Sequence, residues 1–334
     1  MKDWNSIIFS ESIPFEEKVR RVFKYQFEHN PVYHRYCEAL EGGEIISRVE
    51  DDISAIPLLP IEAFKDANVN IGELESEPDL IFKSSGTSDM QPSIHQVPDA
   101  KLYEESLLEG FREYYDLDTA VIWGYTPGYA ENPHSSLIYM IQTLIGQDQQ
   151  GLSRFLPLDK PLDKDAVEEI EKKGKQLILF GAAFGLLDLL EMEETALPSN
   201  SIIIETGGMK THRREMSRKE LHRRLSNGFE LDGSRIHSEY GMAELLSQCY
   251  ATGGPWFNTL PWMQVSIRDP ENPAANMSSG EEGLIGVIDL ANVHSCSFLL
   301  TGDRGMMDDR GRFQVLGRWN PVDLRGCNFL MEED

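Results

Sequence analysis

Apolar residues near the start of the chain recur with the period of a helix. In residues 14–30, Val19, Phe23 and Phe27 fall four positions apart and would share one helical face. A different pattern follows in residues 55–65, where two prolines interrupt an apolar run and predict a connector rather than a helix. The start of the chain is therefore expected to be helical and loop-like.

From residue 80 onward, short apolar runs alternate with helical patterns. The strand-like runs occupy residues 80–82, 119–125, 176–181, 201–208, 234–241, 283–291 and 297–303. The helical patterns fill several of the gaps, at residues 100–115, 135–145, 164–174 and 217–225. Alternation of this kind predicts an α/β fold with mostly parallel sheets and helices on their faces. After Cys249, turns and short strand-like runs dominate and predict an antiparallel or barrel-like portion.

Composition indicates an ordinary globular protein. The 334 residues are 40% hydrophobic and 26% charged, which is enough for one large α/β domain or two smaller ones. The formal net charge of −25 disfavours binding to nucleic acid or to an anionic membrane, because both carry negative charge. No apolar run is long enough to span a bilayer, and the acidic start does not resemble a signal peptide, so we expect a cytoplasmic protein.

The chain has four cysteines, which are Cys37, Cys249, Cys296 and Cys327. They form no C-x-x-C pair and have no closely spaced histidine, which argues against a zinc site. They are also too few for a disulfide scaffold of this size, so reduced thiols are expected.

Polar motifs that contain glycine follow four of the predicted strands. They are S-S-G-T-S at 84–88, T-G-G-M-K at 206–210, Y-G-M-A-E at 240–244 and T-G-D at 301–303. Ligands of α/β sheets gather at the carboxyl ends of strands, so the four motifs are expected to share one ligand. The hydroxyl and backbone N–H groups of the first motif suit a phosphate, although the lysine pattern of the common P-loop is absent.

The order of these motifs resembles that of the adenylate-forming superfamily, which includes acyl-CoA synthetases, luciferases and the adenylation domains of peptide synthetases. The chain is most similar to the long-chain-fatty-acid–protein ligases, the acyl-protein synthetases of bacterial luminescence, and less similar to phenylacetate–CoA ligases. The resemblance extends from about Leu80 to Cys327. It implies an adenylate-forming core with a β-rich end at residues 80–316 and a helical N-terminal region at 1–79 packed on that core. Residues 317–334 would be a hinge remnant and a cysteine-bearing tail, without the usual C-terminal lid domain.

By this resemblance, ATP contacts several of the motifs. The residues expected to bind it are Ser84, Ser85, Gly86, Thr87, Ser88, Gly207, Gly208, Tyr240, Gly241, Asp303 and Arg318. The loop that contains Thr87, one of the expected catalytic residues, would hold the β- and γ-phosphates, and Glu244 would carry the bridging Mg²⁺. Gly207 and Gly208 would form a wall for the adenine near Tyr240. Asp303 and Arg318 would contact the ribose.

The end of the chain carries a further implication of the resemblance. Sixteen residues, 319–334, follow Arg318, so we expect no C-terminal lid domain. The luminescence ligases use a cysteine near their C-terminus as the acyl acceptor, and Cys327 stands at the matching place. Its thiolate would attack the mixed anhydride, release AMP and hold the acyl group as a thioester. A small buried cysteine in a terminal strand is the alternative interpretation.

The predicted activity is therefore ATP-dependent conversion of a carboxylic acid into an acyl-adenylate. The resemblance implies that the acid is a fatty acid, and that the acyl group passes to Cys327 and then to an acyl-accepting partner such as a reductase subunit. Ala243 replaces the usual threonine of its motif, and Asp89, Met90 and Gln91 stand where the family's phosphate loop often carries a later glycine and lysine. Two alternatives stay open: an aryl- or acyl-CoA ligase with a separate lid, and a catalytically weak nucleotide-binding subunit. The segment with Trp123, Tyr125 and His134 is either a pocket wall or aromatic core.

Overall fold

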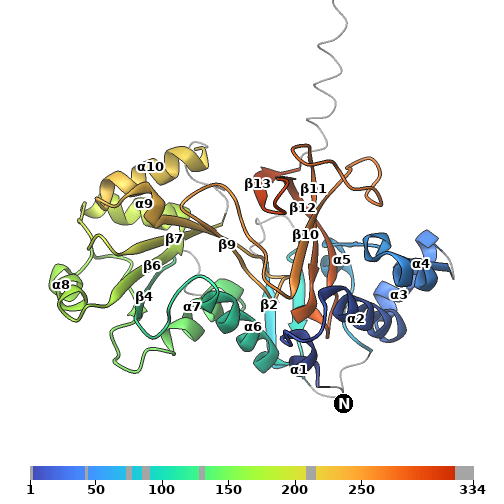
Figure 1. The fold of residues 1–334 in the computed structure, drawn as a ribbon. Coiled ribbons are helices and arrows are strands. Elements are labelled where there is room, and N and C mark those ends of the chain that lie inside the picture. Colours follow the sequence, from blue (N-terminus) through green and yellow to red (C-terminus); the bar gives the residue numbers. More distant parts are fainter. Residues whose placement is uncertain are drawn as a thin grey trace, which may run out of the picture.

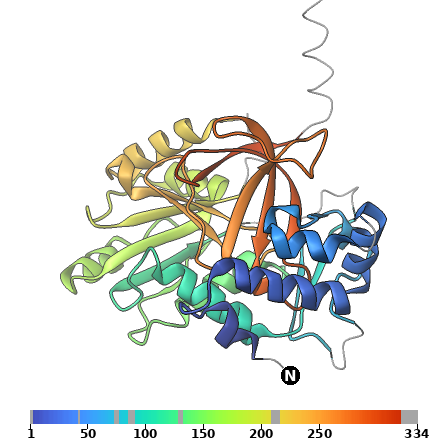
Figure 2. The ribbon, with the colours of Figure 1, turned by 45° about the vertical axis from the view of Figure 1, so that its right-hand side comes forward.

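The computed structural model describes residues 3–41, 44–72, 77–84, 91–127, 132–207 and 216–319. Within these ranges the strands form one sheet of six strands, one of five and one of two. Figure 1 shows the six-stranded sheet and its helices on the left, with the five-stranded sheet upright on the right. In Figure 2, which is turned by 45°, the N-terminal helices lie across the front of the upright sheet.

The N-terminal helices pack through one apolar face each. They are α1 (Trp4–Ile8), α2 (Phe15–His29), α3 (Pro31–Glu41), α4 (Ile45–Asp51) and α5 (Ala63–Asp66), with a 3-10 turn at Ile53–Ala55. Val19, Phe23 and Phe27 are buried on α2, which confirms the predicted helical face. Asn30 ends α2, and its side-chain oxygen accepts hydrogen bonds from two backbone N–H groups in the first turn of α3.

The proline-containing segment 55–65 is more regular than the sequence predicts. Leu59–Pro60 forms strand β1, which pairs in parallel with Leu299 and Leu300 of β12. A proline is tolerated there because β1 lies at the edge of the sheet, where Pro60 needs no N–H donor. The N-terminal region is thus joined to the five-stranded sheet by backbone hydrogen bonds.

The six-stranded sheet is the parallel sheet that the alternating pattern predicts. Its strands, in spatial order, are β5 (Arg154–Phe155), β4 (Ala120–Tyr125), β6 (Gln176–Ala182), β7 (Ile202–Thr206), β8 (Ile236–Tyr240) and β9 (Cys249–Thr252). The first five run parallel, and β9 pairs antiparallel with β8. A 3-10 turn at Gly233–Arg235 leads into β8.

Helices cover both faces of this sheet. They are α6 (Ala100–Arg112), α7 (Ser136–Ile145), α8 (Lys164–Lys172), α9 (Ala183–Met192) and α10 (Arg218–Gly228). Alternate residues of each strand belong to different cores: Phe180 packs in the cluster that contains α6 and α7, and Leu179 packs in the cluster that contains α8, α9 and α10. Because both faces are covered, these strands read as continuous apolar runs.

The strands after β9 are mostly antiparallel, as the pattern after Cys249 predicts, whereas the antiparallel β2–β3 pair was not predicted. The five-stranded sheet adds β10 (Met263–Arg268), β11 (Glu282–Asp289), β12 (Phe298–Met307) and β13 (Phe313–Arg318) to β1. The two-stranded sheet consists of β2 (Leu80–Lys83) and β3 (Ile94–Val97), which pair antiparallel. A 3-10 turn at Leu290–Asn292 follows β11.

A buried carboxylate joins the antiparallel sheet to the segment after β8. Asp289, the last residue of β11, accepts hydrogen bonds from the backbone N–H groups of Leu246 (2.8 Å) and Ser247 (3.0 Å) and from the hydroxyl of Ser247. The side-chain amide of Asn292 donates to the backbone carbonyl of Glu244 (2.9 Å). A carboxylate in an apolar interior is costly unless its oxygens are satisfied, so these bonds fix the segment relative to the sheet.

Replacing Asp289 with asparagine should lower the free energy of unfolding by about 2–4 kcal/mol, because the amide would turn N–H groups toward buried donors. Urea-induced unfolding measures the change. The matched control is Asp116→Asn, since Asp116 accepts hydrogen bonds in an exposed turn and its loss should cost less than about 1 kcal/mol. Equal losses in the two variants would show that the Asp289 bonds do not hold this junction.

Candidate active site

A tyrosine, an aspartate and an arginine from three strands meet beside the end of β8. The hydroxyl of Tyr240, the buried last residue of β8, donates to Oδ2 of Asp303 in β12 (3.0 Å). The Nε of Arg318, at the end of β13, lies 3.0 Å from Oδ1 of the same carboxylate. Burial, followed by the charge of Asp303, raises the pKa of Tyr240, so the phenol keeps its proton and remains a donor.

The T-G-D motif lies inside a strand and not after one, which corrects the sequence-based prediction. β12 continues to Met307 because β13 pairs with its second half, and Asp303 stands opposite Arg318 in that ladder. The apolar run ends earlier, but backbone pairing does not require apolar side chains. The motifs therefore come from three sheets, and the candidate site lies where these sheets meet rather than along one sheet edge.

Glu244 lies beside the entrance to the predicted phosphate loop. It is 5% exposed and accepts a hydrogen bond from the hydroxyl of Ser93. The backbone N–H of Ser93 donates to Oγ of Ser84 (3.0 Å), and the N–H of Ser84 donates to the carbonyl of Ser93 (3.2 Å). Burial raises the pKa of Glu244, and the hydrogen bond from Ser93 and the charge of Arg318 oppose this rise.

The chemistry of Glu244 fits one magnesium ion in the presence of a nucleotide. Mg²⁺ takes one or two carboxylates and completes its shell with phosphate oxygens and water. In the part of the chain that the structure describes, no group of three or more His, Cys, Asp or Glu side chains could hold a metal. A single buried carboxylate is enough for a magnesium site whose other ligands come from the nucleotide and from water.

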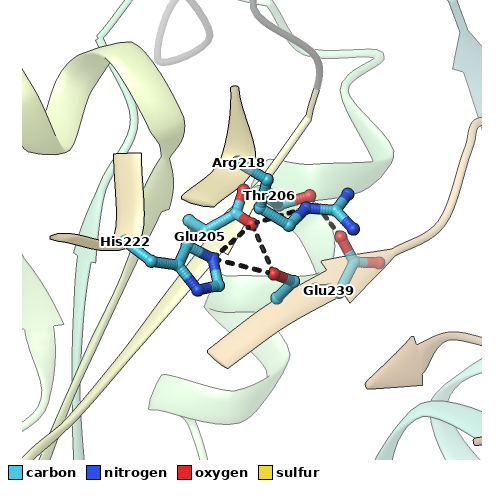
Figure 3. Close-up of polar contacts among 6 residues, drawn as sticks. Glu205, Thr206, Arg218, His222 and Glu239 are labelled. Atoms are coloured by element: carbon cyan, nitrogen blue, oxygen red, sulfur yellow. Dashed lines mark hydrogen bonds and ion pairs between the residues drawn. The ribbon is translucent and has the colours of Figure 1, made fainter. Parts of the chain in front are cut away.

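A side-chain hydrogen bond connects the end of β7 to the end of β8, as Figure 3 shows. Thr206 donates a hydrogen bond to Glu239 on the neighbouring strand. Gly207 follows Thr206 with a φ of +83°, in the left-handed region that favours glycine. A Cβ on Gly241 would overlap Oε1 of Glu239, so a larger residue there would require the Glu239 carboxyl to move.

Sequence analysis missed a second buried glutamate in this region. Glu205 accepts a hydrogen bond from Ser238, and its Oε1 lies 3.2 Å from Nε2 of His222 and 3.5 Å from Nε of Arg218 (Figure 3). The signal was present in the sequence, because Glu205 and Glu239 interrupt strands that are otherwise predicted to be buried. A buried charge of this kind is retained only when partners satisfy it.

A buried histidine, also missed, holds the Y-G-M-A-E turn. The Nδ1 of His95 lies 2.8 Å from the carbonyl oxygen of Ala243, and its Nε2 lies 2.9 Å from Oγ of Ser295. Burial lowers the pKa of His95 to about 4, so the ring is neutral at physiological pH. A neutral ring that donates from Nδ1 accepts at Nε2, which suits these two partners.

The predicted site residues thus divide into two groups. A hydrogen bond and an ion pair link Tyr240, Asp303 and Arg318, while Ser93 links Ser84 to Glu244. The charges of Arg318 and Asp303 act on Glu244, so the two sets lie near each other, with Gly207 and Gly241 at the adjoining strand ends. The predictions for Ser85, Gly86, Thr87, Ser88, Gly208 and Cys327 concern residues outside the described ranges.

The aromatic segment near the site is largely core. Trp123 and Tyr125 are buried in the cluster that contains α8, α9 and α10, which favours the aromatic-core interpretation over a pocket wall. His134 stands against β2 instead, with its Nδ1 3.0 Å from the carbonyl oxygen of Ile81.

Comparison with known proteins identifies the family. A family model described as "Acyl-protein synthetase, LuxE" matches residues 155–334, more than half of the chain. The chain belongs to this family. A synthetase of this kind is a ligase, so the protein is an enzyme, as the sequence predicts. A curated relative of this LuxE family member is the long-chain-fatty-acid–luciferin-component ligase of Vibrio harveyi, which is 23% identical over 340 residues, covering 94% of this chain and 86% of the relative.

Solved structures show that the fold is the one that the resemblance implied. An open conformation of 2-hydroxyisobutyryl-CoA ligase, in complex with 2-HIB-AMP and CoA, aligns with a TM-score of 0.66 and 15% identity, covering 95% of this chain and 79% of the ligase. ATP-bound MatB from Rhodopseudomonas palustris aligns with a TM-score of 0.51 and 16% identity, covering 74% of this chain and 50% of MatB. The LuxE family member therefore has the fold of adenylate-forming ligases. None of its described helices is long and apolar enough to cross a bilayer.

Protonation of Glu239 should make the stability of this LuxE family member depend on pH. Burial, and to a lesser extent the charge of Glu205, raises the pKa of Glu239 to about 7, although the bond from Thr206 opposes the rise. Between pH 4.5 and 7 the folded state then holds a proton that the unfolded state has lost, so the free energy of unfolding falls as pH rises. Relative to Glu239→Gln, the free energy of unfolding of the wild type should fall by on the order of 3 kcal/mol between pH 4.5 and 7.

Chemical denaturation at pH 5 and pH 8 checks this expectation. Glu28→Gln, a change at an exposed glutamate of α2, is the matched control and should follow the wild type at both pH values. If the wild type and Glu239→Gln kept a constant difference in stability, Glu239 would not titrate in this range.

Proposed function

We propose that this protein activates a fatty acid with ATP to form an acyl-adenylate and then transfers the acyl group to its own Cys327. Membership of the acyl-protein synthetase family supports transfer to protein. The name of the Vibrio harveyi relative supports a long-chain fatty acid as the substrate. The observation that carries the proposal is the group formed by Tyr240, Asp303 and Arg318 next to the buried Glu244.

The geometry of Asp303 suits a ribose. Its carboxylate accepts a hydrogen bond from Tyr240 and pairs with Arg318, which fixes its orientation, and the two oxygens of a carboxylate can accept hydrogen bonds from both hydroxyls of a ribose. The ring of Tyr240 is held edge-on by Phe257 (6.0 Å between ring centroids) and Phe313 (5.6 Å). A ring fixed in this way can offer a face to adenine without losing side-chain entropy on binding.

The first step needs no general base, because an ionised fatty acid is already a nucleophile. One carboxylate oxygen of the acid attacks the α-phosphorus of ATP, the bond from that phosphorus to the bridging oxygen breaks, and pyrophosphate leaves. The protein contributes by aligning the two substrates and by stabilising the charge that develops on the phosphates. We assign this task to Arg318, which is half exposed, and to the hydroxyl-rich loop that follows Ser84.

Magnesium is the proposed cofactor, and Glu244 would hold it. The ion would neutralise charge on the nucleotide phosphates when bound. Ser93 orients the carboxylate of Glu244 through its hydroxyl and also contacts Ser84, so the same serine links the metal ligand to the phosphate loop. Removing the Ser93 hydroxyl would remove the hydrogen bond to Glu244 and leave the backbone contacts with Ser84 in place.

Cys327 is the proposed acyl acceptor in the second step. Its thiolate attacks the acyl carbonyl, the bond between the carbonyl carbon and the phosphate oxygen breaks, and AMP leaves with the electron pair. The cysteines in the described part of the chain suit this role poorly, because Cys37, Cys249 and Cys296 are buried and burial raises the pKa of each thiol. The thioester would then pass to an acyl-accepting protein of the cytoplasm.

Exchange of labelled pyrophosphate into ATP should depend on added fatty acid. Glu244→Gln should lower the exchange rate by about 10²–10³-fold, because the amide cannot balance a cation. Glu220→Gln, on the exposed surface of α10, is the matched control and should keep the wild-type rate. A panel of acids of different length measures the substrate preference in the same assay.

The exchange experiment also separates the competing functions. A wild-type protein that binds ATP but exchanges no pyrophosphate with any acid would be a nucleotide-binding subunit. Turnover that requires CoA would instead identify a CoA ligase and contradict transfer to protein.

Labelled fatty acid and ATP should leave label on the protein that neutral hydroxylamine removes. Cys327→Ser should abolish the hydroxylamine-sensitive label, because an oxygen ester resists neutral hydroxylamine. Cys37→Ala is the matched control and should be labelled like the wild type, provided that thermal unfolding shows it to be folded. Unchanged labelling of Cys327→Ser would place the acyl group on another residue.

A further inference from the structure

Glu239 is a buried acid that the proposed reaction does not use. It is 7% exposed and stands directly before Tyr240, while Thr206 on the neighbouring strand stands directly before Gly207. Thr206 and Glu239 are register partners in the β7–β8 ladder, and the hydroxyl of Thr206 donates to Oε2 of Glu239. This side-chain bond connects the two strand ends from which Gly207 and Tyr240 emerge (Figure 3).

The second oxygen of Glu239 fills the remaining space. A Cβ on Gly241 would overlap Oε1 of Glu239, which means that this oxygen packs directly against the backbone of the turn after β8. The carboxyl group is therefore in contact with the end of β7 on one side and with the turn on the other. A shorter side chain would leave a void between the two, and close-packed interiors respond to voids by shifting or by losing stability.

We propose that Glu239 is a positioning residue for the nucleotide: its carboxyl group sets the separation between Gly207 and Tyr240, and ATP binds more tightly when that carboxyl is uncharged. The inference rests on the proposed function, because it takes adenine as the group held between Gly207 and Tyr240. It adds a residue and a regulation by pH that the family resemblance does not supply.

The surroundings of Glu239 favour its uncharged form. Among the residues that the structure describes, the titratable groups that face it are Glu205 from β7, Tyr103 from α6, Tyr115 after α6, and Cys249 and Tyr250 from β9. None of these groups is a cation, and Arg218 of α10, the cation drawn in Figure 3, pairs with Glu205. Burial raises the pKa of Glu239 to about 7, and the charge of Glu205 adds to the rise.

Linkage gives the direction of the effect on ATP. The triphosphate brings further negative charge to the site, which disfavours ionised Glu239. If ATP raises the pKa of Glu239, ionisation of Glu239 must weaken ATP binding by the same factor. The affinity for ATP should therefore fall as pH rises through 7.

Calorimetric titration of the full chain with ATP tests this, in saturating Mg²⁺ between pH 6 and pH 8.5. The wild-type Kd should rise about fivefold over this range. Glu239→Gln preserves the shape of the side chain and the acceptor for Thr206 but cannot ionise. The Kd of this variant for ATP should therefore change with pH only through protonation of the ATP phosphates. Glu205→Gln removes the nearby like charge, so it should keep the pH dependence and move its midpoint to lower pH.

A second pair of variants tests the spacing without changing charge. Thr206→Ser keeps the hydroxyl donor and should retain the wild-type KM for ATP, whereas Thr206→Val should raise that KM about tenfold and leave the KM for the fatty acid unchanged. A general loss of structure would instead affect both constants and would also appear in thermal unfolding.

The outcomes separate this inference from the proposed function. Equal pH dependence of ATP binding in the wild type and in Glu239→Gln would overturn the inference, and so would equal KM values for ATP in the two Thr206 variants. A wild type that binds no ATP at any pH would overturn both. A wild type that binds ATP with the expected pH dependence but exchanges no pyrophosphate would support the role of Glu239 and contradict the proposed reaction alone.

Discussion

Asp289 ends a strand of the antiparallel sheet and accepts hydrogen bonds from the chain segment that carries Glu244. This contact fixes the position of one half of the site relative to the other. Tyr240 and Glu244 belong to the parallel-sheet half of the molecule, whereas Asp303 and Arg318 belong to the antiparallel half. The two halves could pack with small rotations if only apolar side chains met between them. Directional bonds to a buried carboxylate allow one arrangement, since any other leaves charge unsatisfied.

The two-stranded sheet is attached to this junction by the same kind of bond. His95 contacts the carbonyl of Ala243 and the hydroxyl of Ser295, and Ser93 contacts Glu244. The β2–β3 pair that leads into the predicted phosphate loop is thereby oriented toward Glu244, the proposed metal ligand. A site assembled from three sheets in this way is preorganised, and preorganised groups lose little energy to rearrangement during the reaction.

The sequence predicted the elements better than the contacts between them. The runs around Ile122, Leu179 and Ile203 became strands because both faces of a parallel sheet are apolar, and that pattern can be read locally. The roles of Asp289 and His95 could not be read, since their partners are more than 40 residues away along the chain and nothing in their neighbours marks them as buried. The continuation of β12 past Asp303 was not predicted for a similar reason: the pairing with Arg318 that extends β12 is not visible in the residues of β12.

The charges of the site would allow this acidic protein to hold the proposed ATP. Four buried acids lie in this region, but Arg218 pairs with Glu205, Arg318 pairs with Asp303, and a proton neutralises Glu239 below pH 7. Glu244 differs, because the hydroxyl of Ser93 satisfies its hydrogen bonding without bringing a positive charge. Burial of an ionised carboxylate is costly until a cation joins it. A triphosphate likewise carries negative charge that needs a cation. One magnesium ion between Glu244 and the phosphates would neutralise charge on both. The affinity for ATP and the affinity for the metal would then be coupled at Glu244.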